Sequence, residues 1–136
     1  MITENSESLC DLNSEEHVRL LVFTFYDAVR QDRMLGPVFN GVLEGRWDEH
    51  LEKLCNFWNA VLFGREGYSG RPFPPHAALA IGKEHFERWL QIFVHTVDCN
   101  FKGEKAEEAK WRADKMATLF LSKIQYLRAN PHRVLL

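Results

Sequence analysis

Apolar residues recur every three or four positions along most of this 136-residue chain, and no stretch of useful length alternates with a period of two. That spacing gathers apolar side chains on one face of a helix, whereas a half-buried strand needs strict alternation. The pattern predicts four main helices, over about residues 14–29, 46–62, 83–101 and 104–129. Leu35-Gly36-Pro37 predicts a tight corner after the first helix, with Phe39 on a short segment beyond it. The fold class is therefore all-α.

Composition limits both the size of the molecule and its partners. With 46% apolar residues, 136 positions suffice for one domain whose core can enclose a cavity. Seventeen basic and 19 acidic residues give a net charge of -2, which lacks the positive field that nucleic acids attract. Three widely spaced cysteines form no CxxC or CxxCH motif and indicate a reduced cytoplasm. No apolar run approaches the roughly 18 residues of a membrane span, so we expect no membrane partner.

Glycines and prolines crowd the stretch between residues 64 and 75, which predicts a loop. The loop leads into Pro75 and His76 at the start of a short apolar segment ending at Ile81, and this approach directs His76 toward the interior. A neutral imidazole in such surroundings is a good iron ligand. The alternative is a core histidine with a purely structural role.

Tyr26, His50 and Trp89 lie on the apolar faces of three different predicted helices. Each carries a polar hydrogen that needs a partner when it is buried. Together they could converge over one small cavity opposite His76, where they would suit a polarised diatomic molecule or a peroxide; singly, each is also consistent with an ordinary core role. Cys55 is interpreted as a small buried hydrophobe. The other histidines are expected at the surface or its boundary: His17, His85, His95 and His132.

Motifs spread along the chain, from about Leu20 to Ala129, match one known family together. The most specific are Pro75-His76-Ala77-Ala78-Leu79-Ala80-Ile81, His85-Phe86-Glu87-Arg88-Trp89-Leu90 and Phe93-Val94-His95-Thr96-Val97-Asp98, supported by Phe25-Tyr26, Phe39 and Phe57-Trp58. The pattern resembles the truncated (2-on-2) haemoglobins, and among them the group III or P subfamily. The stretch after Trp58 lacks the Gly-Gly pair typical of the other groups, which favours group III.

The resemblance implies a globin-like 2-on-2 helical sandwich that holds haem b. It implies one truncated-globin domain over residues 1–136, with a flexible N-terminal extension at 1–13 and a C-terminal tail at 130–136. His76 matches the proximal iron ligand, and Tyr26, His50 and Trp89 match distal residues that stabilise a bound ligand. The expected contacts of the macrocycle are Phe39, which stacks on it, the wall residues Leu54, Trp58, Ile81 and Phe86, and Lys53 and Arg71 as candidate propionate partners.

The expected function is reversible binding of dioxygen and related diatomic molecules, including nitric oxide and carbon monoxide. Several preorganised donors in a dry pocket would retain a ligand that carries partial negative charge. Slow release suits redox or detoxification chemistry on nitric oxide or peroxide, supported by an unidentified reductase, better than bulk transport. Two other classes stay open: a helical sensor or small-molecule binding module, with or without haem, and a scaffold for a partner protein.

Overall fold

The computed structural model describes residues 9–64 and 81–130, and within these ranges it contains five helices and no extended strand. The helices are α1 (Glu15–Gln31), α2 (Leu35–Leu43), α3 (Trp47–Phe63), α5 (Lys83–Asn100) and α6 (Glu104–Ala129). The all-α fold class is thus confirmed. His76 and Arg71 lie outside the described residues, as does His132.

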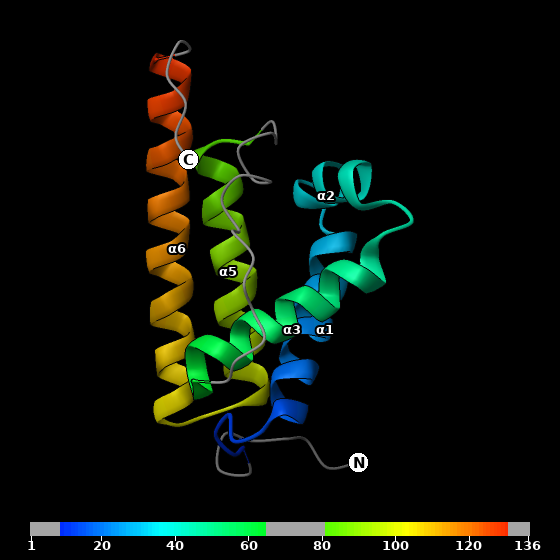
Figure 1. Ribbon diagram of the computed structural model, residues 1–136, viewed down its shortest axis with the longest axis vertical. Helices are drawn as coiled ribbons and strands as arrows, with labels where there is room; N and C mark the ends of the chain where they lie inside the picture. Colours follow the sequence, from blue (N-terminus) through cyan, green and yellow to red (C-terminus); the bar gives the residue numbers. More distant parts are fainter. Residues whose placement is uncertain (1–8, 65–80, 131–136) are drawn as a thin grey trace.

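The helices form two groups that cross each other. α5 and α6 run antiparallel, side by side, and a short turn connects them (Figure 1). α1 packs against α2, α3 and α5, and α3 crosses obliquely to reach α6 (Figure 1). Because α1 contacts three other helices, side chains on its buried face can meet side chains from all of them.

The apolar face of α1 follows the predicted periodicity. Ser14 caps the helix by accepting a hydrogen bond from the backbone N–H of His17 (3.2 Å). The buried residues recur every three or four positions: Val18, Leu21, Val22, Phe25, Tyr26 and Val29. Tyr26 therefore points inward, as the sequence indicated.

Small residues line the buried face of α6. Ala106, Ala109, Ala113 and Ala117 are buried along its first half, and Phe120 and Ile124 follow in its second. Short side chains let two helix backbones approach closely. This explains how α6 packs along α5, its main neighbour.

The corner expected at Leu35-Gly36-Pro37 is wrong, because these residues form the first turn of α2. The chain reverses earlier, at residues 32–34. Proline is tolerated there because the amides of a first helical turn have no partner within the helix. Gly36 allows a close approach, since a Cβ atom at this position would lie 2.6 Å from the carbonyl oxygen of Arg30. α2 then carries Phe39, which is buried.

Residues 10–12, placed by sequence in a flexible extension, pack onto the body of the molecule. Leu12 is fully buried, and Cys10 forms an isolated parallel bridge with Phe101. The carboxylate of Asp11 accepts hydrogen bonds from the first free amides of α6, at Lys105 (2.9 Å) and Ala106 (2.8 Å). These two hydrogen bonds cap α6, since its own N-cap residue, Gly103, supplies no side-chain hydrogen bond.

Gly103 makes that cap possible. Its φ of +146° lies in a region that side chains disfavour, and an added Cβ atom would lie 2.5 Å from Cγ of Asp11. A glycine is therefore required where Asp11 approaches the start of α6.

Candidate functional site

Tyr26 is the meeting point of α1, α2 and α3. Its buried ring lies edge-on to His50, with 5.7 Å between ring centroids, and to Phe39, at 6.1 Å. Trp47, in the first turn of α3, lies 6.2 Å from it by the same measure. These contacts enclose the tyrosine on the sides that face α2 and α3.

Trp89 reaches Tyr26 from α5, and its indole N–H donates a hydrogen bond to the tyrosine hydroxyl. The indole is held by Phe25, edge-on at 5.4 Å, and by Phe93, stacked at 5.7 Å. Burial raises the pKa of Tyr26 to about 12, although the hydrogen bond from Trp89 acts in the opposite direction. The hydroxyl is therefore neutral at physiological pH and keeps its own proton for a second partner.

His50 lies one turn beyond Trp47 on α3 and is half-buried. Its ring is edge-on to both Tyr26 (5.7 Å) and Trp47 (5.9 Å), and its Nε2 atom is shielded from solvent. Tyr26 thus contacts both His50 and Trp89, so the structure brings these three predicted site residues together from three helices.

The predicted wall residues fall into two groups. Ile81 belongs to a small buried cluster with Phe120 and Ile124, against which the half-buried Phe86 packs. Trp58 instead lies in the main core. Its ring stacks on that of Phe93, 5.2 Å away and inclined by 18°.

Leu54 is half-buried against the same main core, and Lys53 is exposed on α3. Apolar side chains together with two buried polar groups, the Tyr26 hydroxyl and His50 Nε2, fit a largely apolar cofactor that carries a polar ligand.

Three residues near this cluster were not predicted as functional. Trp47 is one of them, although it precedes His50 by three positions, a spacing that places both side chains on one face of a helix. Asp32 and Arg88 form an ion pair of 2.7 Å between the turn after α1 and helix α5. No local pattern signals that pair, because its members are 56 positions apart in the sequence.

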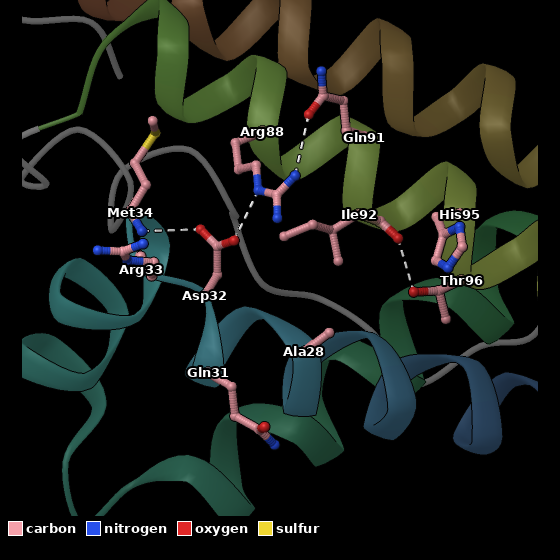
Figure 2. A pocket seen from close by; sticks show the side chains of 10 residues that line it. All are labelled: Ala28, Gln31, Asp32, Arg33, Met34, Arg88, Gln91, Ile92, His95 and Thr96. Atoms are coloured by element: carbon pink, nitrogen blue, oxygen red, sulfur yellow. Dashed lines mark hydrogen bonds and ion pairs between the residues drawn. The ribbon is translucent and has the colours of Figure 1, made fainter.

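A pocket lies between the end of α1 and the middle of α5, with a volume of about 870 Å³. Figure 2 shows it with the Asp32–Arg88 pair across it. Among the described residues, none of those predicted for the site belongs to its lining, which consists of Ala28, Gln31, Asp32, Arg33, Met34, Arg88, Gln91, Ile92, His95 and Thr96.

The remaining histidines and Cys55 have simple structural positions. His95 is exposed and His85 is half-buried at the start of α5, where its Nδ1 accepts from the N–H of Gly82 (3.0 Å). His17 is more enclosed than expected, since its ring lies 5.4 Å from that of Phe101. Cys55 is buried, as predicted.

Comparison with known proteins places this geometry in a family. The model of the bacterial-like globins matches residues 11–122. A group 3 truncated haemoglobin from Campylobacter jejuni is 34% identical over 111 residues, which cover 79% of this chain and 87% of that protein. A crystal structure of a group III truncated haemoglobin from the same species matches with a TM-score of 0.76 and 30% identity, covering 91% of this chain and 95% of the other.

The chain therefore belongs to the bacterial-like globin family. Within that family it is a truncated haemoglobin of group III, as the sequence motifs indicated. It is a haem-binding globin whose cofactor is haem b and whose ligands are diatomic gases such as dioxygen. In the part of the chain that the structure describes, no helix is long and apolar enough to cross a membrane.

Proposed function

We propose that this globin performs redox or detoxification chemistry on its bound ligand, with nitric oxide and dioxygen or with peroxide, rather than bulk oxygen transport. The observation that supports this most is the hydrogen bond from the Trp89 indole to the Tyr26 hydroxyl. Haem b, when bound, supplies the iron that binds the gas and exchanges electrons with it.

The residues around Tyr26 supply hydrogen bonds to the ligand. Because Trp89 already occupies an acceptor position of the Tyr26 oxygen, the tyrosine proton is free to point into the pocket. His50 adds a second donor. Each bond to a ligand with partial charge contributes about 1.5 to 3 kcal/mol, so two of them slow its escape by orders of magnitude. Such retention is poorly suited to delivery and gives time for reaction.

The remaining roles follow from position. His76, in the motif that ends at Ile81, is the proximal iron ligand, and Phe39 stacks on the macrocycle. Further contacts with the macrocycle are proposed for Leu54, Trp58, Ile81 and Phe86, and contacts with the propionates for Lys53 and Arg71. Support for the apolar group comes from the burial of Phe39, Trp58 and Ile81.

The proposed ligands and partners follow from this chemistry. Carbon monoxide and nitric oxide bind as dioxygen does, and a reductase of unidentified nature returns the iron to its ferrous form. The cytoplasm is the proposed location, and the free thiols of Cys10, Cys55 and Cys99 support it, since free cysteines are typical of reducing compartments.

The absorption spectrum of the purified protein tests the role of His76. We expect a strong Soret band that shifts when carbon monoxide is added to the reduced protein. His76→Ala should lose stable haem retention, whereas the matched variant of an exposed histidine, His95→Ala, should keep it. A His76→Ala variant with an unchanged spectrum would rule out this residue as the iron ligand.

Stopped-flow measurement of oxygen release tests the distal donors. Tyr26→Phe should speed release by about tenfold or more, the factor that corresponds to one charge-assisted hydrogen bond. The effects of Tyr26→Phe and Trp89→Phe should not add in the double variant, because the two side chains share a hydrogen bond. Tyr126→Phe, at an exposed position on α6, is the control. Fast release that Tyr26→Phe leaves unchanged would contradict the proposal.

A further inference from the structure

Asp32 uses both of its carboxylate oxygens to join three helices. It lies in the turn that follows α1, and its side chain is only 6% exposed. Oδ2 accepts from the backbone N–H groups of Met34 (3.1 Å) and Leu35 (3.0 Å) at the start of α2, and Oδ1 accepts from Nε of Arg88 on α5 (2.7 Å). One buried carboxylate therefore connects the end of α1, the beginning of α2 and α5.

Arg88 completes this connection from the other side. Its Nη1 also donates to Oε1 of Gln91, one turn further along α5 (3.3 Å), so the guanidinium is held by its own helix while it binds Asp32 (Figure 2). The next residue is Trp89. The three elements that Asp32 connects are those that carry Tyr26, Phe39 and Trp89.

We propose that Asp32 and Arg88 are positioning residues that hold α5 at the distance at which the Trp89 indole N–H reaches the Tyr26 hydroxyl. What this hydrogen bond does for a ligand rests on the proposed function. The positioning itself rests only on the contacts of the described residues.

The other contacts of Trp89 cannot set this distance alone. Its neighbours Phe25 and Phe93 are aromatic rings, and apolar contacts tolerate sliding. A hydrogen bond, in contrast, weakens steeply with distance and angle. The Asp32–Arg88 ion pair is directional, and Arg88 is the residue before Trp89 on α5. Because Asp32 directly follows α1, the pair restricts the sliding of α5 along α1 that the aromatic rings allow.

The pair is suited to fixing position rather than to general stability. The Arg88 side chain is 45% exposed, and ion pairs with such exposure contribute little to the free energy of unfolding. Burial alone raises the pKa of Asp32, but hydrogen bonds from Leu35, Arg88 and Met34 outweigh it and hold the pKa below its usual 3.8. The carboxylate is therefore charged throughout the physiological pH range.

The test reads the Trp89 indole directly, by NMR of protein with ¹⁵N-labelled tryptophan, in the carbon monoxide complex and without haem. The chain has four tryptophans, and Trp89→Phe assigns the signal. In Arg88→Met the Trp89 N–H should exchange with water about five to ten times faster, as expected for loss of one hydrogen bond. Arg88→Lys should have a smaller effect, because an ammonium group keeps the charge but not the planar fork.

A second readout is the C–O stretching frequency of the carbon monoxide complex, which should shift in Arg88→Met in the same direction as in Tyr26→Phe. The matched control is Arg19→Met. It removes an arginine–carboxylate pair with similar distances, Arg19 to Glu52 at 2.8 and 2.9 Å, which joins α1 to α3 instead of α5. This control should leave the exchange rate of the Trp89 indole N–H and the C–O stretching frequency unchanged.

Unchanged Trp89 exchange in both Arg88 variants would overturn the proposal, and so would equal changes in all four indole signals, which would indicate general loosening. Because the exchange measurement is also made without haem, it gives its result even if the spectrum of the protein contradicts the proposed function. If Arg88→Met does not fold, the exchange rate of the Trp89 N–H in Arg88→Lys is compared with that in Arg19→Met. Faster exchange in Arg88→Lys alone would support the proposal, and equal rates in the two variants would overturn it.

Discussion

The proposed role of Tyr26 as a hydrogen-bond donor depends on its surroundings as much as on its chemistry. Burial keeps its hydroxyl neutral, and the indole of Trp89 orients it. A donor that is fixed before a ligand arrives stabilises charge without the reorganisation that water would need. The aromatic contacts with Phe39, Trp47 and His50 therefore help to fix the Tyr26 ring in position.

The ionisation of Tyr26 gives a prediction at high pH. Its pKa is raised from 10.0 to about 12 in the folded protein. The unfolded chain therefore loses this proton first, and the contribution of Tyr26 to stability, complete below pH 10, declines as the pH rises from 10 toward 12. Urea unfolding across this range should show a smaller decline for Tyr26→Phe, and an equal decline in both proteins would contradict the raised pKa.

For single residues, the sequence indicated which side chains point inward and that three of them could converge, but it did not indicate the ion pair beside them. The periodicity placed Tyr26, His50 and Trp89 on inward faces, and the structure shows them in one cluster. The Asp32–Arg88 pair could not be predicted, since neither residue lies on an apolar face and only the packing of α5 against the turn after α1 brings them together. The position of His76 is still a prediction, because it lies outside the described residues.

At the scale of elements, the start of α6 depends on a residue far away in the sequence. Asp11→Ala removes an acceptor for two amides of the first turn of α6 and should destabilise the protein by about 1 to 2 kcal/mol. Urea denaturation measures this loss. Asp114→Ala, at an exposed position in the middle of α6, is the control.

The predicted effect of Asp11→Ala also depends on pH. Burial acts to raise the pKa of Asp11, but three backbone hydrogen bonds and the charge of Lys105 lower it below 3.8. The stabilisation is therefore present above this value and is lost as the pH falls through the lower pKa of the folded state. Equal stability of Asp11→Ala and the wild type at neutral pH would show that this cap is dispensable.

Long, strongly periodic elements were predicted best. The expected helices at 46–62, 83–101 and 104–129 agree with α3, α5 and α6 within one residue at each end. α2 was missed because it is only nine residues long and its glycine and proline are typical of turns. A proline in the first turn of a helix and a proline at a corner have similar neighbours in the sequence. Which of the two structures forms therefore depends on how the segment packs against the rest of the molecule.

At the scale of the molecule, the apolar interior is divided. The main core joins all five described helices. Among the residues that the structure describes, a second cluster has Ile81, Phe120 and Ile124 as its buried members. The smaller cluster includes a predicted haem-contact residue, Ile81, and the half-buried Phe86 packs against it. Because Ile81 and Phe86 are predicted contacts of the macrocycle, we expect the stability of this cluster to depend on the cofactor.

Hydrogen exchange measures this dependence. Binding of haem should increase protection of amides near Phe120 and Ile124, and change protection near Val22 and Phe93 in the main core much less. His76→Ala should show no such increase if His76 is the proposed iron ligand, because the variant would then lose the cofactor. An equal increase in protection in the small cluster and in the main core on haem binding would contradict this prediction, because it would show that the interior responds as one unit.

The contact between Asp11 and Lys105 also has a consequence for the order of folding. It joins residues 94 positions apart, and closing a loop of that length costs about 4 kcal/mol of chain entropy if nothing else has folded. We therefore expect this contact to form late, after the helices between its ends have docked. Interactions that form after the transition state slow unfolding without speeding folding. We therefore expect the contact of Asp11 with the start of α6 to slow unfolding of the native state without being part of the folding nucleus.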